Sequence, residues 1–161
     1  MTMIKAESFT YTDTDKKYWN DLIPGQQYAY GEYQVSEQEI IAFAKNYDPM
    51  EFHTDPGKAK ASPLGVLCAS GVHTLAIKQR LSFDNVFKYW HIVAGKSLRQ
   101  CQFIRPVLVN DIISATMTIL ELDDSSQPHQ GIVVIKVQVK NHKQQVVLKV
   151  EGEVVLLKKP T

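Results

Sequence analysis

The sequence of 161 residues lacks most features that mark specialised classes of protein. Its longest apolar run is only a few residues, far short of the roughly 20 that a membrane-spanning helix needs. The N-terminal segment MTMIKAESFTYTDTDKKYWN has no apolar stretch of the kind found in secretory signals. The formal net charge is only +1, so neither nucleic acid nor an anionic membrane is an expected partner. We therefore expect a cytoplasmic protein.

Cysteine is scarce as well. Cys68 and Cys101 are the two cysteines, and they lack the short spacing of metal ligands, so we expect two reduced thiols and no metal site. The chain has no internal repeat, low-complexity segment or domain boundary. We expect one domain over residues 1–161, with residues 1–24 as a loosely ordered lead-in tied down by Tyr18 and Trp19.

The first half of the chain predicts one strand and several helices. Aromatic alternation over 28–35 indicates a strand. Ser36 and Glu39 form a capping-box pattern before a helical repeat, and Pro49 ends that helix at Asp48. The longest helix begins between Val66 and Gly71 and runs to about residue 83.

The second half predicts strands, which are rich in β-branched residues over 89–94, 96–104, 111–122, 131–141 and 144–157. Val133, Ile135, Val137 and Val139 lie on one face of the expected strand, with Lys136, Gln138 and Lys140 on the other, and indicate one buried face. A polar hairpin loop is expected at 123–131 and a tight hairpin at 141–143. Together the elements predict an α+β fold, in which an antiparallel sheet curls round the long helix.

The stretch YDPMEFHTDP, residues 47–56, carries one histidine among three carboxylates. Asp48 and His53 would lie about 140° apart on a continuous helix, but Pro49 excludes that helix and a bend can bring them together. An aspartate beside a histidine orients the ring for acid/base chemistry. Alternatively, Asp48 is simply solvated and His53 packs nearby. Asp55 is an expected N-cap and Glu51 an expected solvated charge.

The stretch ASPLGVLCASGVHT, residues 61–74, leads into the long helix. If the helix starts at Ser70-Gly71, its first N–H groups form a site for a carbonyl or an oxyanion. Alternatively, Gly71 serves close packing of the helix against the sheet. His73 is expected to be a packed histidine rather than a catalyst.

These two stretches together closely resemble the hydratase motif of the MaoC-like acyl dehydratases, the family of (R)-specific enoyl-CoA hydratases. The pattern D-x-x-x-x-H-x-D is present from Asp48 to Asp55, followed by an alanine, Ser62, Gly65 and finally Ser70-Gly71. A second stretch, FIRPVLVND from residue 103 to 111, is similar to the family's F-x-R-P-V-x-x-G-D. The resemblance covers roughly residues 36–122 and implies the hot-dog fold.

The resemblance also implies roles for individual residues. Asp48 and His53 become the catalytic pair, which activates a water for addition to a trans-2-enoyl-CoA and gives a 3-hydroxyacyl-CoA. The backbone of Gly71 becomes the site of the thioester carbonyl, with Ser62 and Ser70 as further substrate-binding residues. The implied partners are an acyl-CoA of fatty acid metabolism and a second copy of the chain in a homodimer, and no cofactor is needed.

Three departures from the family pattern leave alternatives open. Many members have Asn-Pro where this chain has Met50-Glu51, His-Gly in place of Ser70-Gly71, and glycine in place of Asn110, which is therefore expected in the left-handed conformation. A hot-dog thioesterase and a non-catalytic acyl-CoA binder are the competing hypotheses. Four cations are candidates for CoA phosphates, each with a solvated surface charge as the favoured interpretation: Lys78, Lys96, Arg99 and Arg105.

Overall fold

The computed structural model describes residues 4–5 and 15–161. Its elements in chain order are β1 (Ile4–Lys5), the 3-10 helix η2 (Trp19–Asp21), β2 (Gln27–Gln34), α1 (Glu37–Tyr47), α2 (Glu51–Thr54), α3 (Pro56–Ala61), α4 (Gly71–Asn85), the 3-10 helix η3 (Phe87–Tyr89), β3 (Ile92–Phe103), β4 (Ile112–Gln127), β5 (Gln130–Lys140) and β6 (Val146–Leu157).

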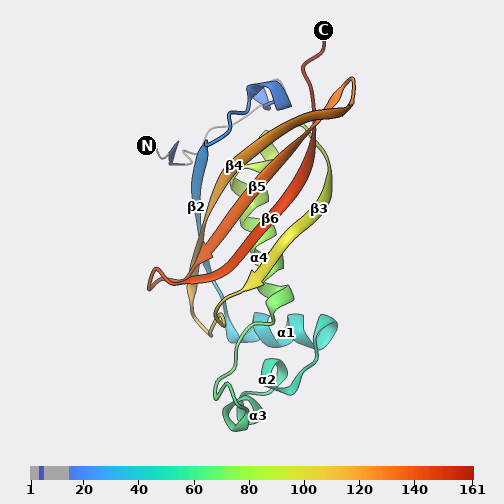
Figure 1. The fold of residues 1–161 in the computed structure, drawn as a ribbon. Coiled ribbons are helices and arrows are strands. Elements are labelled where there is room, and N and C mark those ends of the chain that lie inside the picture. Colours follow the sequence, from blue (N-terminus) through green and yellow to red (C-terminus); the bar gives the residue numbers. More distant parts are fainter. Residues whose placement is uncertain (1–3, 6–14) are drawn as a thin grey trace.

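The strands form one sheet in the order β1-β2-β4-β5-β6-β3. The two-residue β1 pairs with β2 in parallel, and the other pairings are antiparallel. The sheet curls round α4, while α1, α2 and α3 lie beyond one end of it, beside the start of α4 (Figure 1). The predicted α+β architecture, an antiparallel sheet around a long central helix, is confirmed.

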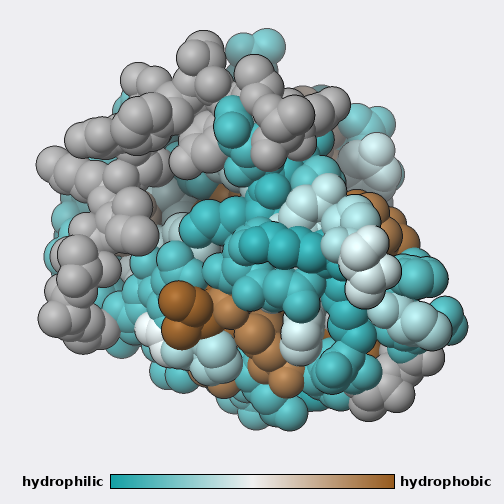
Figure 2. All heavy atoms as spheres, turned by 90° about the horizontal axis from the view of Figure 1, so that it is seen from above, coloured by the Kyte–Doolittle hydropathy of each residue, from teal (hydrophilic) through white to brown (hydrophobic). Residues whose placement is uncertain are grey.

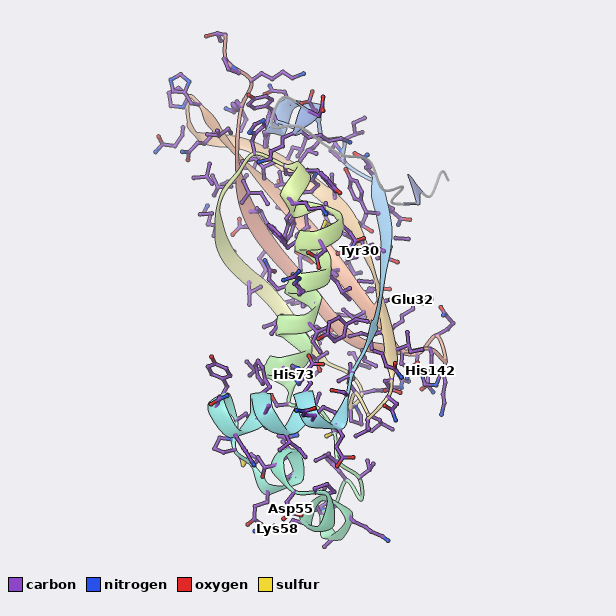
Figure 3. All side chains as sticks on the ribbon, turned by 180° about the vertical axis from the view of Figure 1, so that it is seen from behind. Tyr30, Glu32, Asp55, Lys58, His73 and His142 are labelled. Carbon is purple, nitrogen blue, oxygen red and sulfur yellow. The ribbon has the colours of Figure 1, made fainter. Side chains whose placement is uncertain are left out.

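The core lies between the concave face of the sheet and α4. Ile77 and Leu81 of α4 are buried against the sheet, and the alternating apolar face predicted for β5 is buried from Val133 to Val139. Each such side chain contributes about 1.5–3 kcal/mol on burial. Tyr30 of β2 reaches α4, where its hydroxyl lies 2.8 Å from Ser82 Oγ (Figure 3). This packing holds α4 at a fixed position within the sheet.

Two strand boundaries differ from the sequence prediction. The strands expected at 89–94 and 96–104 are one strand, β3, whose register shifts three times along β6, and residues 87–89 form a 3-10 helix before it. The polar hairpin expected at 123–131 is present, but its loop is shorter than predicted, because β4 continues to Gln127 and β5 starts at Gln130. Polarity alone cannot separate an exposed strand end from a loop.

The hairpin predicted at 141–143 is confirmed and extends to residue 145. Asn141 Oδ1 accepts hydrogen bonds from the backbone N–H groups of Lys143 and Gln145. Gln144 between them has φ 62°, the left-handed conformation that closes this turn.

The helix boundaries follow the capping signals in the sequence. Ser36 Oγ accepts from Glu39 N at 3.1 Å at the start of α1, and the helix ends at Tyr47 with Asp48 as its C-cap. Asp55 caps α3 by accepting from Gly57 N and Lys58 N. The sequence analysis missed α2, because four residues are too few to show a helical repeat.

Residues 15–24 are held against the sheet by aromatic contacts. Trp19 Nε1 donates to Ile132 O at 3.0 Å, and the Tyr18 ring stacks on His91 with 4.0 Å between centroids. The remainder of the predicted lead-in, residues 1–3 and 6–14, lies outside the described residues. In the view of Figure 2 the surface is mostly hydrophilic, with hydrophobic residues gathered in small patches. Across the described ranges, every helix is too short or too polar to cross a bilayer.

Candidate active site

Asp48 and His53 come together at the bend between α1 and α2. Asp48 follows the last turn of α1 in a non-helical conformation (φ −156°, ψ 71°), Pro49 turns the chain, and α2 carries His53 back. His53 Nε2 lies 3.8 Å from Asp48 Oδ2, with the Asp48 side chain 29% exposed and His53 buried. The structure therefore brings the two side chains of the predicted pair together, His53 within the protein and Asp48 open to solvent.

A hydrogen bond to the backbone fixes which nitrogen of His53 faces Asp48. His53 Nδ1 lies 2.7 Å from the carbonyl oxygen of Cys68, which can only accept, so Nδ1 carries the proton in the neutral ring. Nε2 then presents its lone pair to the Asp48 carboxylate. Two acceptors 3.8 Å apart do not bond to each other, but a water between them can donate one hydrogen to each.

The start of α4 supplies free backbone donors a few residues beyond Cys68. Ser70 is the N-cap: its Oγ accepts from His73 N at 3.2 Å, and its carbonyl accepts from Thr74 N. The N–H groups of Gly71 and Val72 precede the first intrahelical bonds and are left for a ligand or water. The positive end of the helix dipole strengthens this site for a polarised carbonyl.

A cavity of about 210 Å³ lies beside Gly71. Its walls come from α4, from the end of β3 and from the segment that follows β3, and a Cβ built on Gly71 would lie 2.9 Å from the Phe103 ring. The absence of a side chain at Gly71 therefore permits close packing against Phe103, as the alternative interpretation held. Gly71 itself lines the cavity, so close packing and a role for its backbone in binding a ligand are compatible.

The corner at residues 103–111 supports this cavity. Ala69 N donates to Val107 O at 2.9 Å, which ties the segment before α4 to the corner. Asp111 Oδ2 accepts from Leu108 N at 2.8 Å, and Asn110 has φ 66°, so its predicted left-handed conformation is confirmed.

Ser62 and Ser70 have structural duties that the sequence did not reveal. The Ser62 hydroxyl donates to Ala59 O at 2.7 Å at the end of α3. Ser70 is fully buried and uses its oxygen to cap α4. Both remain candidates for substrate contacts, Ser70 because it is adjacent to Gly71.

A second polar cluster, which the sequence analysis missed, lies where α1 crosses the start of α4. Glu39 Oε1 accepts from Tyr33 OH at 2.5 Å and lies 3.1 Å from Nε2 of His73, whose ring stacks on Phe43. The capping-box pattern implied that the Glu39 side chain accepts from the backbone N–H of the N-cap residue Ser36, and that part of the prediction is wrong. Burial and the hydrogen bond to Glu39 raise the pKa of Tyr33 to about 12. The Ser36–Glu39 spacing predicted the N-cap of α1, but it did not predict the tertiary partners of Glu39.

The two residues at which the loop departs from the family pattern face solvent. The Glu51 side chain is 70% exposed and pairs with Lys58 of α3, so its carboxylate is already matched by a cation. Met50 is exposed too. Figure 3 places Asp55 and Lys58 together at the α2–α3 end of the molecule.

The four cations proposed for CoA phosphates are not equivalent. Arg99 Nη2 lies 2.9 Å from Glu153, and Arg105 Nη1 donates to Val146 O, so both have protein partners. Lys96 is exposed. Lys78 is only 4% exposed, so the expected solvated surface charge is wrong for this residue, and a buried ammonium needs another explanation.

The sequence from residue 20 to residue 141 matches the family described as the MaoC like domain. The chain belongs to this family. The uncharacterized protein YdeM of Bacillus subtilis is 31% identical over 133 residues, which cover 83% of this chain and 92% of YdeM. The 3-hydroxyacyl-thioester dehydratase Z of Mycobacterium tuberculosis is 29% identical over 92 residues, 56% of this chain and 61% of the dehydratase.

A crystal structure of a MaoC-like dehydratase from Rhodospirillum rubrum superposes on this MaoC-like chain with a TM-score of 0.84. The two are 28% identical, and the match covers 90% of this chain and 99% of the other. The predicted hot-dog fold is therefore confirmed. Within the described ranges of this MaoC-like chain, no group of three or more His, Cys, Asp or Glu side chains is arranged to hold a metal ion.

Proposed function

We propose that the protein is an enoyl-thioester hydratase, which adds water to a trans-2-enoyl-CoA to give a 3-hydroxyacyl-CoA, or catalyses the reverse dehydration. The observation that carries the proposal is the hydrogen bond from His53 Nδ1 to Cys68 O, which leaves Nε2 facing Asp48 across 3.8 Å. Membership of the MaoC-like family and the likeness to a 3-hydroxyacyl-thioester dehydratase support it.

The proposed reaction uses both parts of the site. The Gly71 N–H donates to the thioester carbonyl, which makes the β-carbon electrophilic and stabilises the enolate that forms. Asp48 and His53 hold the water and take one of its protons as the hydroxyl adds to the β-carbon. The pair then returns a proton to the α-carbon, so the enzyme ends as it began.

The test follows two signals from one reaction with trans-2-enoyl-CoA substrates. Loss of the conjugated double bond without release of free thiol is the expected result. Asp48→Asn and His53→Ala should each lower kcat by at least about a hundredfold. Two matched controls, Glu51→Gln and His129→Ala, change exposed residues of the same types and should keep full activity. Retained turnover in Asp48→Asn would reject the proposed role of the pair.

One observation favours the thioesterase hypothesis as a second candidate. The Glu39 carboxylate lies beside the first turn of α4, through its 3.1 Å contact with His73. Release of free thiol, abolished by Glu39→Gln but not by Asp48→Asn, would establish that activity instead. Binding of acyl-CoA with neither signal across a broad panel would leave the non-catalytic binder.

We also propose that two copies associate through β3. This strand is the last in the sheet order, and most of its side chains are exposed, including Val93, Leu98 and Phe103. An open edge of this length, with several exposed apolar side chains, favours pairing with another strand. Light scattering should give twice the mass of one chain, and a monomer at high concentration would contradict the proposal.

A further inference from the structure

A second cavity, of about 390 Å³, lies between α4 and strands β3, β5 and β6, away from the catalytic pair. Its walls are largely apolar, with contributions from Phe87, Leu98, Ile135, Val137, Val150 and Val154. An apolar cavity beside a long helix is suited to an aliphatic chain. The polar groups in the cavity wall determine which substituent the end of such an aliphatic chain can have.

Lys78 is the buried cation of this cavity. Its Nζ lies 3.2 Å from Gln79 Oε1 and 5.9 Å from the centre of the Phe87 ring, and both residues also line the cavity. Burial lowers the pKa of Lys78 to about 8, so the ammonium is still mostly charged at neutral pH. The Cys101 thiol lies close enough to interact electrostatically with it.

The carboxylate in the same wall is already used. Glu153 accepts from Arg99 at 2.9 Å and from Ser97, and the further cation Lys96 also lines the cavity. Within the described part of the chain, Lys78 forms no ion pair with a carboxylate. The cavity therefore has an excess of positive charge and a single buried ammonium that is free to take an anionic group.

This cavity and the cavity beside Gly71 lie along one side of α4. Gly71, Thr74 and Lys78 share a helical face, and seven residues of helix place Lys78 about 10 Å from Gly71 along the axis. Gly71 and Thr74 line the first cavity with Phe103, and Lys78 lines the second with Leu98, so β3 borders both. An acyl chain that has its carbonyl at Gly71 and extends along α4 towards β3 would reach Lys78.

We propose that the second cavity receives the far end of the acyl chain and that Lys78 binds a carboxylate there, so that the enzyme prefers enoyl thioesters of dicarboxylic acids to their plain aliphatic counterparts. This inference rests on the proposed function. A buried lysine without a carboxylate partner lowers the stability of the fold. Such a cost is typical of a residue retained for binding a ligand.

The experiment compares two pairs of molecules that differ only at the far end of the chain. Octanoyl chains are chosen because their extended length is close to that of two helical turns. Hydration rates are measured for trans-2-octenoyl-CoA and trans-2-octenedioyl-CoA, and binding is measured by calorimetry for the saturated octanoyl-CoA and octanedioyl-CoA. We expect kcat/KM and affinity about tenfold or more higher for the dicarboxylic member of each pair, as for one charge-assisted hydrogen bond.

Lys78→Met should abolish this preference, so that trans-2-octenedioyl-CoA and trans-2-octenoyl-CoA have equal kcat/KM, whereas the matched variant Lys96→Met should keep the preference. Equal rates on both enoyl substrates would overturn the inference and leave the proposed function standing. If neither is hydrated, the proposed function fails, and the calorimetric pair alone decides whether Lys78 binds the carboxylate. Free octanoate binding to wild type but not to Lys78→Met, without any difference between the CoA pair, would assign the site to a free fatty acid and overturn the inference.

Discussion

Replacing Lys78 by methionine should make the protein more stable at neutral pH. Burial lowers the pKa of Lys78 from 10.5 to about 8, and each step of one in pKa corresponds to 1.36 kcal/mol. Holding the charged ammonium in the fold therefore costs about 3 kcal/mol. Methionine has a similar length and helix propensity and removes the charge. Loss of the hydrogen bond to Gln79 offsets about 1 kcal/mol, which leaves a net gain of about 2 kcal/mol.

The gain should depend on pH in a defined direction. Between the two pKa values the unfolded chain holds the proton of Lys78 more tightly than the folded chain does, so wild-type stability rises with pH through that window. The cost is fully present below about pH 8 and is lost as the pH approaches 10.5. Near the upper limit the gain of the variant should therefore be lost, because the missing hydrogen bond to Gln79 then outweighs the remaining cost of the buried ammonium.

Urea unfolding followed by the fluorescence of Trp19 and Trp90 measures this difference. In thermal unfolding at pH 7, the same gain of about 2 kcal/mol raises Tm by about 4–8 °C for a domain of this size. Lys96→Met, at an exposed site of the same cavity, should change stability by less than about 0.5 kcal/mol. An unchanged or lowered stability of Lys78→Met at pH 7, or a gain that is equal at pH 7 and pH 10.5, would refute the reasoning.

Three further predictions concern the ends of α1 and α4. Ser70→Ala removes the N-cap of α4 and should lower the free energy of unfolding by about 1 kcal/mol, measured from urea midpoints at unchanged slope. Gly71→Ala should lower hydration activity, because the added Cβ displaces the Phe103 ring into the cavity. The double variant with Phe103→Ala should restore part of the lost rate, and no recovery would argue against that steric cause. Glu39→Gln should lower the pKa of Tyr33 from about 12 only in part, because burial is the larger cause of the raised pKa. Ultraviolet titration, with Tyr33→Phe as the reference, measures this pKa, and a full return to 10.0 would contradict this order of causes.

The sequence predicted the parts of the fold that depend on local signals. Ser36, Pro49 and Asp55 each act through their immediate neighbours, so the ends of α1 and α3 were predictable from capping and proline geometry. The alternation of β5 predicted its buried face because side chains in a strand alternate regardless of distant partners. The boundary between β4 and β5 was not predictable, since exposed polar residues occur equally in strand ends and loops.

The site was predictable as a set of residues but not as an arrangement. The Asp48–His53 spacing, with its likeness to a family pattern, selected the pair, but the Cys68 carbonyl that orients the ring is a backbone atom with no signature of its own. Burial of Lys78 was missed because a lysine in a helix is usually solvated. The Tyr33–Glu39–His73 cluster depends on how α1 crosses α4, which is settled only by tertiary packing.

The short segment from Cys68 to Gly71 has a consequence for how the site tolerates motion. Its first carbonyl orients the His53 ring and its last residue, Gly71, lines the cavity, so both parts of the proposed site depend on the same few peptide units. Peptide planes are stiff, and this span is pinned through Ala69 to Val107. The segment therefore fixes the distance between the proposed base and the proposed carbonyl donor. Helices α1 to α3 can shift relative to the sheet without changing that distance, provided the His53–Cys68 hydrogen bond holds.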